Sequence, residues 1–147
     1  MKHLFVILLL AISTFSYGQN NTVSWAFESK KTGKNEYTLY LKATIKDGWY
    51  VYSQYLESDD GPVRTEIVLE DEGTISLDGK AVEEGQQIKG YDNLFDMNII
   101  KYKKHLTITQ KIHTKGDEKV KGYITFMTCN DEQCLPPTDV PFEIKLK

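Results

Sequence analysis

The sequence predicts an all-β domain in which short antiparallel strands form a sandwich or a barrel. Apolar and polar residues alternate through much of the chain, with the two-residue period of a half-buried strand. Turn signals recur every ~8–12 residues, as in sandwiches and barrels. No window carries the sustained apolar stripe of an amphipathic helix. These observations favour an antiparallel β fold over any helical one.

The first strands are predicted near the amino end. Residues 37–45 alternate strictly between apolar and polar side chains. Asp47-Gly48 predicts a turn. Residues 49–55 are rich in aromatic side chains, so they predict the next strand.

The series of strands continues to the end of the chain. Further strands are predicted at 65–69, 75–77, 99–102, 106–112, 123–129 and 140–146. The stretch from Gly85 to Met97 fits neither the strand nor the helix period, so it is predicted to be a long loop. It carries two aromatic residues, Tyr91 and Phe95, and long loops often carry function.

The amino end has the anatomy of a secretory signal peptide. An apolar run from Leu4 to Ile12 is followed by Ser16-Tyr17-Gly18, which fits a cleavage site. The run is well short of the ~20 residues that a spanning helix needs. We therefore expect residues 1–18 to be removed. Residues 19–147 should form one periplasmic or otherwise exported domain that does not insert into a membrane.

Charge narrows the choice of partners. Removal of the signal peptide leaves 17 basic and 21 acidic residues, a net charge of −4. A mildly acidic surface of mixed sign argues against nucleic acid or an anionic membrane as the main partner.

Two cysteines, Cys129 and Cys134, are the strongest chemical signal. An exported chain normally holds such a pair oxidised. Five steps of extended strand would separate the two Cα atoms by ~17 Å, whereas a disulfide needs roughly 4.4–6.8 Å. The chain must therefore reverse between them, and the polar residues 130–133 suit a hairpin loop.

A disulfide that only staples the hairpin is the simplest interpretation of the pair. Closing so short a loop would stabilise the fold by only ~2 kcal/mol, against ~4.7 kcal/mol for a loop of a hundred residues. A bridge that contributes little to folding is better placed for redox chemistry. Asp131 and Glu132 would raise the thiol pKa values by like-charge repulsion. Raised thiol pKa values favour a domain that passes electrons to other proteins, and they disfavour a strong oxidant.

Metal binding and hydrolysis are weaker alternatives. The cysteine spacing is wider than the C-x2-C of zinc sites, and nothing in the sequence brings His105 or His113 to the pair. No third residue can be named to orient a Cys–His nucleophile. We expect no metal and no cofactor besides the disulfide itself.

Two segments resemble one known family. FMTCNDEQCLPP, residues 126–137, and GWYVYS, residues 48–53, are similar to the active-site hairpin and the aromatic strand of the amino-terminal periplasmic domain of DsbD, the transmembrane thiol–disulfide interchange protein. Val23-Ser24-Trp25 resembles the opening of the same family domain, and Gly61-Pro62 followed by Thr65 resembles one of its turns. The similarity extends over nearly all of residues 19–147.

The resemblance implies an immunoglobulin-like β-sandwich with a redox-active cysteine pair. By analogy, Cys134 forms the mixed disulfide with a partner and Cys129 resolves it. The implied donor is a thioredoxin-like protein. The implied acceptors are thioredoxin-like periplasmic proteins, among them disulfide isomerases and proteins of cytochrome c maturation.

The resemblance also implies a cap loop over the cysteines that ends in an aromatic ring. Phe95 takes the position of that ring, in a cap loop made of Tyr91, Asp92, Asn93, Leu94 and Phe95. The implied surroundings of the pair are Tyr50, Tyr52, Asp131, Glu132 and Pro136. An apolar lid of this kind would protect the bridge from unwanted exchange.

The sequence departs from the family in two ways. Asn93 and Leu94 stand where acidic residues precede the ring in the family's best-known member, so a proton-transfer role there is in doubt. The sequence also ends without a membrane conduit or a second, thioredoxin-like domain. We expect a separate membrane protein to supply electrons. A non-catalytic binding module, with Tyr91 and Phe95 as recognition aromatics, stays open as the alternative.

Overall fold

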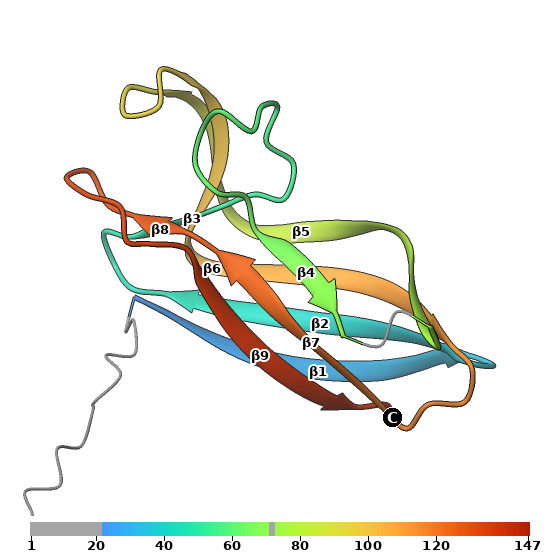
Figure 1. The fold of residues 1–147 in the computed structure, drawn as a ribbon. Coiled ribbons are helices and arrows are strands. Elements are labelled where there is room, and N and C mark those ends of the chain that lie inside the picture. Colours follow the sequence, from blue (N-terminus) through green and yellow to red (C-terminus); the bar gives the residue numbers. More distant parts are fainter. Residues whose placement is uncertain (1–21, 71–72) are drawn as a thin grey trace, which may run out of the picture.

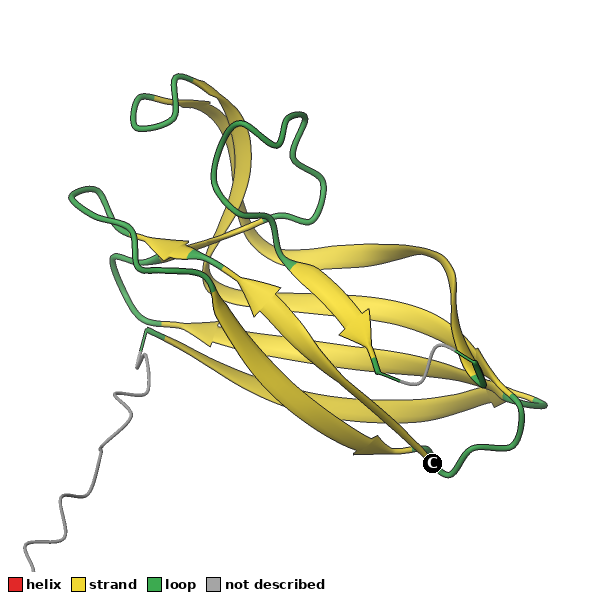
Figure 2. Cartoon of the chain, viewed as in Figure 1, coloured by secondary structure: helices red, strands yellow, loops and turns green. Residues whose placement is uncertain are grey.

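The computed structural model describes residues 22–70 and 73–147, so the predicted signal peptide lies outside the described residues. Within them, all regular structure is β-strand and no helix occurs (Figure 2). The strands are β1 (Val23–Gly33), β2 (Glu36–Ile45), β3 (Tyr50–Tyr52), β4 (Glu66–Leu69), β5 (Ile75–Asp92), β6 (Met97–Thr114), β7 (Lys119–Phe126), β8 (Thr128–Cys129) and β9 (Thr138–Lys145).

These strands form two antiparallel sheets that face each other (Figure 1). The larger sheet has the order β1-β2-β6-β3-β8, and β5 pairs with the other edge of β6. The smaller sheet has the order β4-β7-β9. Ser29 of β1 donates a hydrogen bond to the Lys145 carbonyl oxygen of β9 (2.6 Å), which ties the two sheets along one side. The predicted immunoglobulin-like antiparallel sandwich is confirmed.

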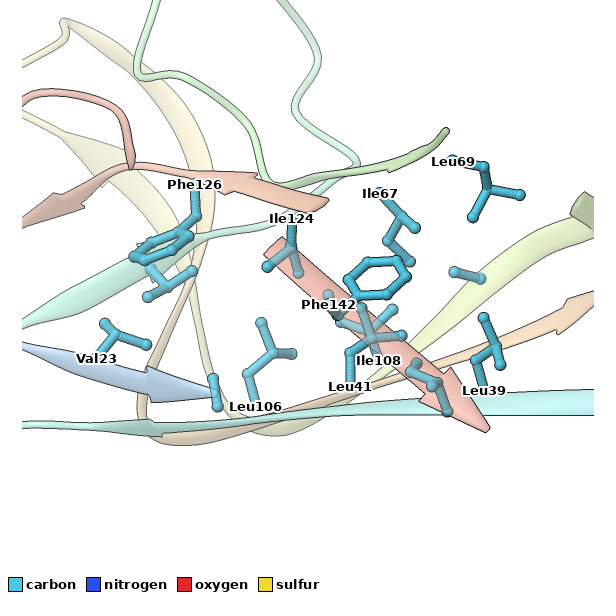
Figure 3. Packing of buried hydrophobic residues seen from close by; sticks show 14 of the residues in the cluster. Val23, Leu39, Leu41, Ile67, Leu69, Leu106, Ile108, Ile124, Phe126 and Phe142 are labelled. Carbon is cyan, nitrogen blue, oxygen red and sulfur yellow. The ribbon is translucent and has the colours of Figure 1, made fainter. Parts of the chain in front are cut away.

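The main core lies between the sheets, where strand alternation turns one set of side chains inward. Figure 3 shows these side chains meeting from the two layers. The fully or nearly fully buried members include Leu39, Leu41, Leu106 and Ile108 from the larger sheet and Ile124, Phe126 and Phe142 from the smaller one. In the strands predicted at 37–45 and 140–146, the side chains therefore alternate because every second one is buried against this core.

The predicted strands at 99–102 and 106–112 are one strand, β6. The polar run at 103–105 looks like a break in the sequence because it forms a β-bulge, where Lys104 has a left-handed φ of 63°. The strand predicted at 75–77 is likewise only the beginning of β5. Each prediction ended early because a bulge interrupts the alternation without ending the strand.

The prediction of a long loop from Gly85 to Met97 is wrong. The end of β5 and the start of β6 continue as a hairpin that extends beyond the sandwich (Figure 1), and only residues 93–96 form its turn. We call residues 86–103 the arm. Most of its β5 side is exposed, so its residues lack the alternating burial of a sheet packed on a core. That is why its sequence lacks the period of a strand.

Gly85 marks the base of the arm. A Cβ atom here would lie 2.4 Å from the His105 carbonyl oxygen, so the close approach of the two backbones at the bulge excludes a side chain. Gly85→Ala is expected to lower the free energy of unfolding by about 1–3 kcal/mol, because the backbone must shift to relieve the clash. Urea denaturation checks this. Gly90→Ala on the same arm is the control, since no atom lies within 4 Å of the added methyl group.

Two further strand predictions need correction, and both corrections position the cysteines. The predicted strand at 49–55 is reduced to β3, after which the chain leaves the sheet. The predicted strand at 123–129 divides at Met127 into β7 and β8, which belong to different sheets. The chain therefore crosses from the smaller sheet to the larger one directly before Cys129, and β8 pairs with β3.

Candidate functional site

The two cysteines close a tight hairpin at the end of β8. Cys129 and Cys134 pair across it, with Cα atoms 4.0 Å apart and a disulfide S–S distance of 2.01 Å. The side-chain oxygen of Asn130 accepts hydrogen bonds from the backbone N–H groups of Glu132 (2.9 Å) and Gln133 (2.8 Å). The predicted chain reversal across 130–133 is confirmed, and Asn130 shapes it as an Asx turn does.

The two sulfur-bearing residues differ in accessibility. Cys129 is only 1% exposed, because it lies within β8 against β3. Cys134 is partly exposed. An attacking thiolate needs access to the sulfur that it attacks. The arrangement therefore makes Cys134 the more reachable end of the bridge.

Strand alternation places the disulfide outside the main core. Val51 of β3 and Tyr102 of β6 pair with each other and face the sandwich interior. Tyr50 and Tyr52, one residue either side of Val51, point the other way. Tyr50 is the register partner of Cys129. The two tyrosines thus share the outer face of the sheet with the bridge.

A second, smaller apolar cluster forms on that outer face. It is separate from the main core, and we call it the outer cluster. Its buried members are Tyr52, Leu56, Ile99, Met127 and Cys129, and the partly buried side chains packed on them are Phe95, Met97 and Cys134. The disulfide is therefore embedded in a local apolar patch.

The turn at the tip of the arm covers this cluster with an aromatic ring. Phe95 meets Tyr52 edge to face, with ring centroids 5.8 Å apart and an interplanar angle of 84°. Such edge contacts are favourable between aromatic rings. The structure thus brings together Phe95, Tyr52 and the cysteine pair.

Charged and polar groups surround the cluster. Lys101 of β6 forms an ion pair with Asp92 (Nζ–Oδ2 2.7 Å), and its ammonium lies 4.3 Å from the centre of the Tyr50 ring. Tyr50 in turn donates a hydrogen bond to Asp131 in the cysteine hairpin (3.3 Å). These contacts connect the arm to the hairpin.

Burial and charge shift two pKa values at this site. Burial is the main cause that raises the pKa of Tyr52 well above its ordinary value, and the nearby Asp92 and Tyr50 add to it. Burial also acts to raise the pKa of Asp92. The hydrogen bonds from Lys101 and from the backbone N–H of Leu94 outweigh burial, and the pKa of Asp92 is lowered. The Tyr52 hydroxyl is therefore neutral, and the Asp92 side chain is an ionised carboxylate.

A groove of about 340 Å³ lies between the arm and the cysteine hairpin. Its lining residues are Tyr52, Tyr91, Asp92, Asn93, Leu94, Lys101, Asn130 and Asp131. Tyr91 and Leu94 are 60% and 57% exposed at its rim. The Tyr91 hydroxyl donates to the Asp96 carboxylate, and this hydrogen bond is the main cause that raises the Tyr91 pKa. The groove leaves apolar side chains open to solvent beside the bridge.

The remaining sequence-predicted residues contribute less. Glu132 and Pro136 are exposed on the hairpin and its exit, where Pro136 accepts a hydrogen bond from the Thr138 hydroxyl (3.3 Å). Sequence reasoning missed Lys101, Met127 and Asn130. Lys101 lies in β6 and Met127 at the break between β7 and β8, and neither the register of β6 nor that break can be deduced locally. Asn130 carried a usable signal, because Asn at the start of a turn commonly accepts backbone hydrogen bonds.

The described part of the chain, residues 22–70 and 73–147, holds no group of three or more His, Cys, Asp or Glu that could bind a metal ion. Nor does that part contain a helix with the length and apolar character needed to cross a bilayer.

Comparison with known proteins agrees with this geometry. Residues 20–145 match the family model described as the N-terminal domain of the thiol:disulfide interchange protein DsbD. No curated protein sequence matches the chain.

Two solved structures share the fold. The N-terminal periplasmic domain of ScsB from Proteus mirabilis has a TM-score of 0.66 and 16% identity, over 86% of this chain and 47% of that one. This chain thus spans about half the length of the ScsB domain chain that it matches. The N-terminal domain of DsbD from Neisseria meningitidis, in the reduced form, has a TM-score of 0.51 and 18% identity, over 82% of this chain and 85% of that one.

The family match extends over most of the chain, and the cysteines of the matched region lie at disulfide distance. Together these findings indicate thiol–disulfide interchange as the general chemistry. The chain belongs to the family of DsbD N-terminal domains.

Proposed function

We propose that this domain relays electrons between exported proteins through the Cys129–Cys134 disulfide. One observation carries the proposal: the bridge lies on the outer face of the sheet, with one buried cysteine, one partly exposed cysteine and an aromatic ring beside them. A purely structural bridge has no need of an accessible end. A relay needs one.

The exchange proceeds in two displacements. A thiolate of a reduced donor attacks the sulfur of Cys134, the S–S bond breaks, and Cys129 leaves as a thiolate. The second thiol of the donor then attacks the mixed disulfide and releases Cys134. The donor ends as a disulfide, and the domain holds two thiols after taking up two electrons and two protons.

Discharge runs the same steps in reverse. Cys134 as a thiolate attacks the disulfide of an acceptor, and Cys129 resolves the mixed disulfide so that the bridge reforms. Thioredoxin-like proteins are the expected donor and acceptors, since they carry exposed dithiol or disulfide pairs of this kind. A separate membrane protein would supply the donor with electrons, and the periplasm is the expected compartment.

Phe95 acts as the cap in this proposal. Its contact with Tyr52 holds the arm turn over the outer cluster, and opening of that turn would uncover the bridge. The exposed Tyr91 and Leu94 stand at the rim, where a docking protein would meet them first.

A reduction potential tests the proposal. We expect the reduction potential of the Cys129–Cys134 couple to lie above about −300 mV. Structural disulfides of secreted proteins typically have reduction potentials below that value. We also expect a reduced thioredoxin-like protein to reduce the Cys129–Cys134 bridge within minutes. Thiol labelling followed by mass spectrometry measures both. A bridge that resists this donor and titrates below that limit would contradict the relay.

A binding module without redox chemistry is the second candidate. The exposed apolar rim of the groove favours it, because exposed apolar side chains often mark contact sites. The same titration separates the two functions, since a bridge that serves only as a staple in a binding module should resist reduction.

A further inference from the structure

An ion pair beneath the arm turn has no part in the exchange chemistry. Lys101 and Asp92 are 2.7 Å apart, and their side chains are only 17% and 10% exposed. Placing two charges in such a shielded position is costly unless they pair closely. The pair is built into the sheet, because Lys101 lies in β6 opposite Tyr52 of β3.

Asp92 uses its two carboxylate oxygens for different purposes. Oδ2 meets the Lys101 ammonium, whereas Oδ1 accepts a hydrogen bond from the backbone N–H of Leu94 (2.9 Å). Phe95 also donates a backbone hydrogen bond to this carboxylate. Asp92 therefore connects the fixed strand to the turn that carries the Phe95 ring.

Lys101 is held from the other side as well. Its ammonium lies 4.3 Å from the centre of the Tyr50 ring, in cation–π geometry. Tyr50 is the register partner of Cys129 and donates a hydrogen bond to Asp131. The Lys101 ammonium thus contacts the Tyr50 ring on the side of the cysteines. Through its ion pair with Asp92 it is also connected to the turn that carries Phe95.

We propose that Lys101 is a positioning residue that latches the cap: through Asp92 it holds the Phe95 turn closed over the Cys129–Cys134 bridge. The inference rests on the proposed function, since a latch matters only where the bridge reacts. In the resting state, the ion pair and the contact of Phe95 with Tyr52 together keep the cap closed. Loss of either charge then shifts the turn toward an open form.

The sign of the effect distinguishes a latch from direct electrostatics. A cation near a disulfide attracts an anionic thiolate, so its removal should slow attack if Lys101 acted on the reagent. Removal of a latch should speed attack. Lys101→Met therefore gives opposite results for the two roles.

The experiment measures the rate at which dithiothreitol reduces the oxidised domain. We expect Lys101→Met and Asp92→Asn each to speed reduction about tenfold, as loss of a partly shielded ion pair would. The Asn side chain keeps an oxygen for the Leu94 N–H, so Asp92→Asn removes the charge and spares the turn. The double variant should react no faster than either single variant. Lys101→Arg should restore a slow rate.

Two controls separate the latch from a general effect of lysine removal and from any route that bypasses the ring. Lys89→Met, which removes an exposed lysine from the facing strand β5, should leave the rate unchanged. Lys101→Met should also have no effect when added to Phe95→Ala, because the latch acts only through the ring. If Lys101→Met fails to fold, Asp92→Asn is measured with and without Phe95→Ala. A direct effect of charge on the thiolate would persist in the Phe95→Ala background, whereas an effect of the latch would disappear there.

An unchanged or slower rate in Lys101→Met, or an equal acceleration in the Phe95→Ala background, would overturn the latch. These outcomes are independent of the relay itself. A small reductant reports on the cap whether or not a protein donor exists, and the reduction potential reports on the relay whether or not the latch exists.

Discussion

Cys134→Ser is expected to suppress the mixed disulfide with a thioredoxin-like protein, whereas Cys129→Ser should preserve and trap it. In Cys129→Ser the partly exposed Cys134 is free to attack a partner's disulfide, and no resolving thiol remains. In Cys134→Ser the remaining thiol belongs to Cys129, which is 1% exposed. We expect at least about tenfold less adduct, because reactivity requires access. Non-reducing electrophoresis with an oxidised thioredoxin-like protein measures it.

The two variants control each other. Both lose the same short bridge and hence the same stabilisation of about 2 kcal/mol. A difference in adduct therefore reports the position of the sulfur and not the stability of the domain. Equal trapping by both cysteines would show that burial in this structure does not set the order of attack.

Phe95→Ala is expected to speed reaction of the bridge with a small thiol by about ten- to a hundredfold. The Phe95 ring packs on Tyr52 and on the outer cluster that contains both cysteines. Removing a part-buried ring costs about 1.4–2.8 kcal/mol, which corresponds to those factors if the cost falls on the closed form of the turn. Stopped-flow reduction of the oxidised domain checks the rate.

Leu94→Ala is the matched control for the cap. Leu94 lies beside Phe95 on the same turn but is 57% exposed, so its loss should change the small-thiol rate less than twofold. A Phe95→Ala rate equal to that of the wild type would remove the cap from the mechanism. Equal acceleration by both variants would indicate a general loosening of the turn.

The strands that pack on the main core could be predicted from the sequence. Residues 37–45 and 140–146 alternate because one face of each strand is buried between the sheets. The arm could not be predicted in this way. It extends beyond the sandwich, most of its β5 side is exposed, and a bulge at Lys104 separates it from the rest of β6. Its residues therefore look like a loop.

The site was predictable where the signal is local. The spacing of the cysteines required a hairpin, and the resemblance to a family singled out Phe95, Tyr50 and Tyr52. Lys101 could not be found, because its role depends on which residues of β3 and β5 lie beside it. Such cross-strand neighbours are set by register over the whole sheet, and a single sequence does not state the register.

The separation of the outer cluster from the main core also bears on how such a domain can diverge. Side chains that keep the sandwich folded and side chains that surround the bridge form largely separate sets. Distant sites usually contribute additively to stability. Substitutions at the tip of the arm can therefore alter the surface around the bridge while the stability of the sandwich is retained.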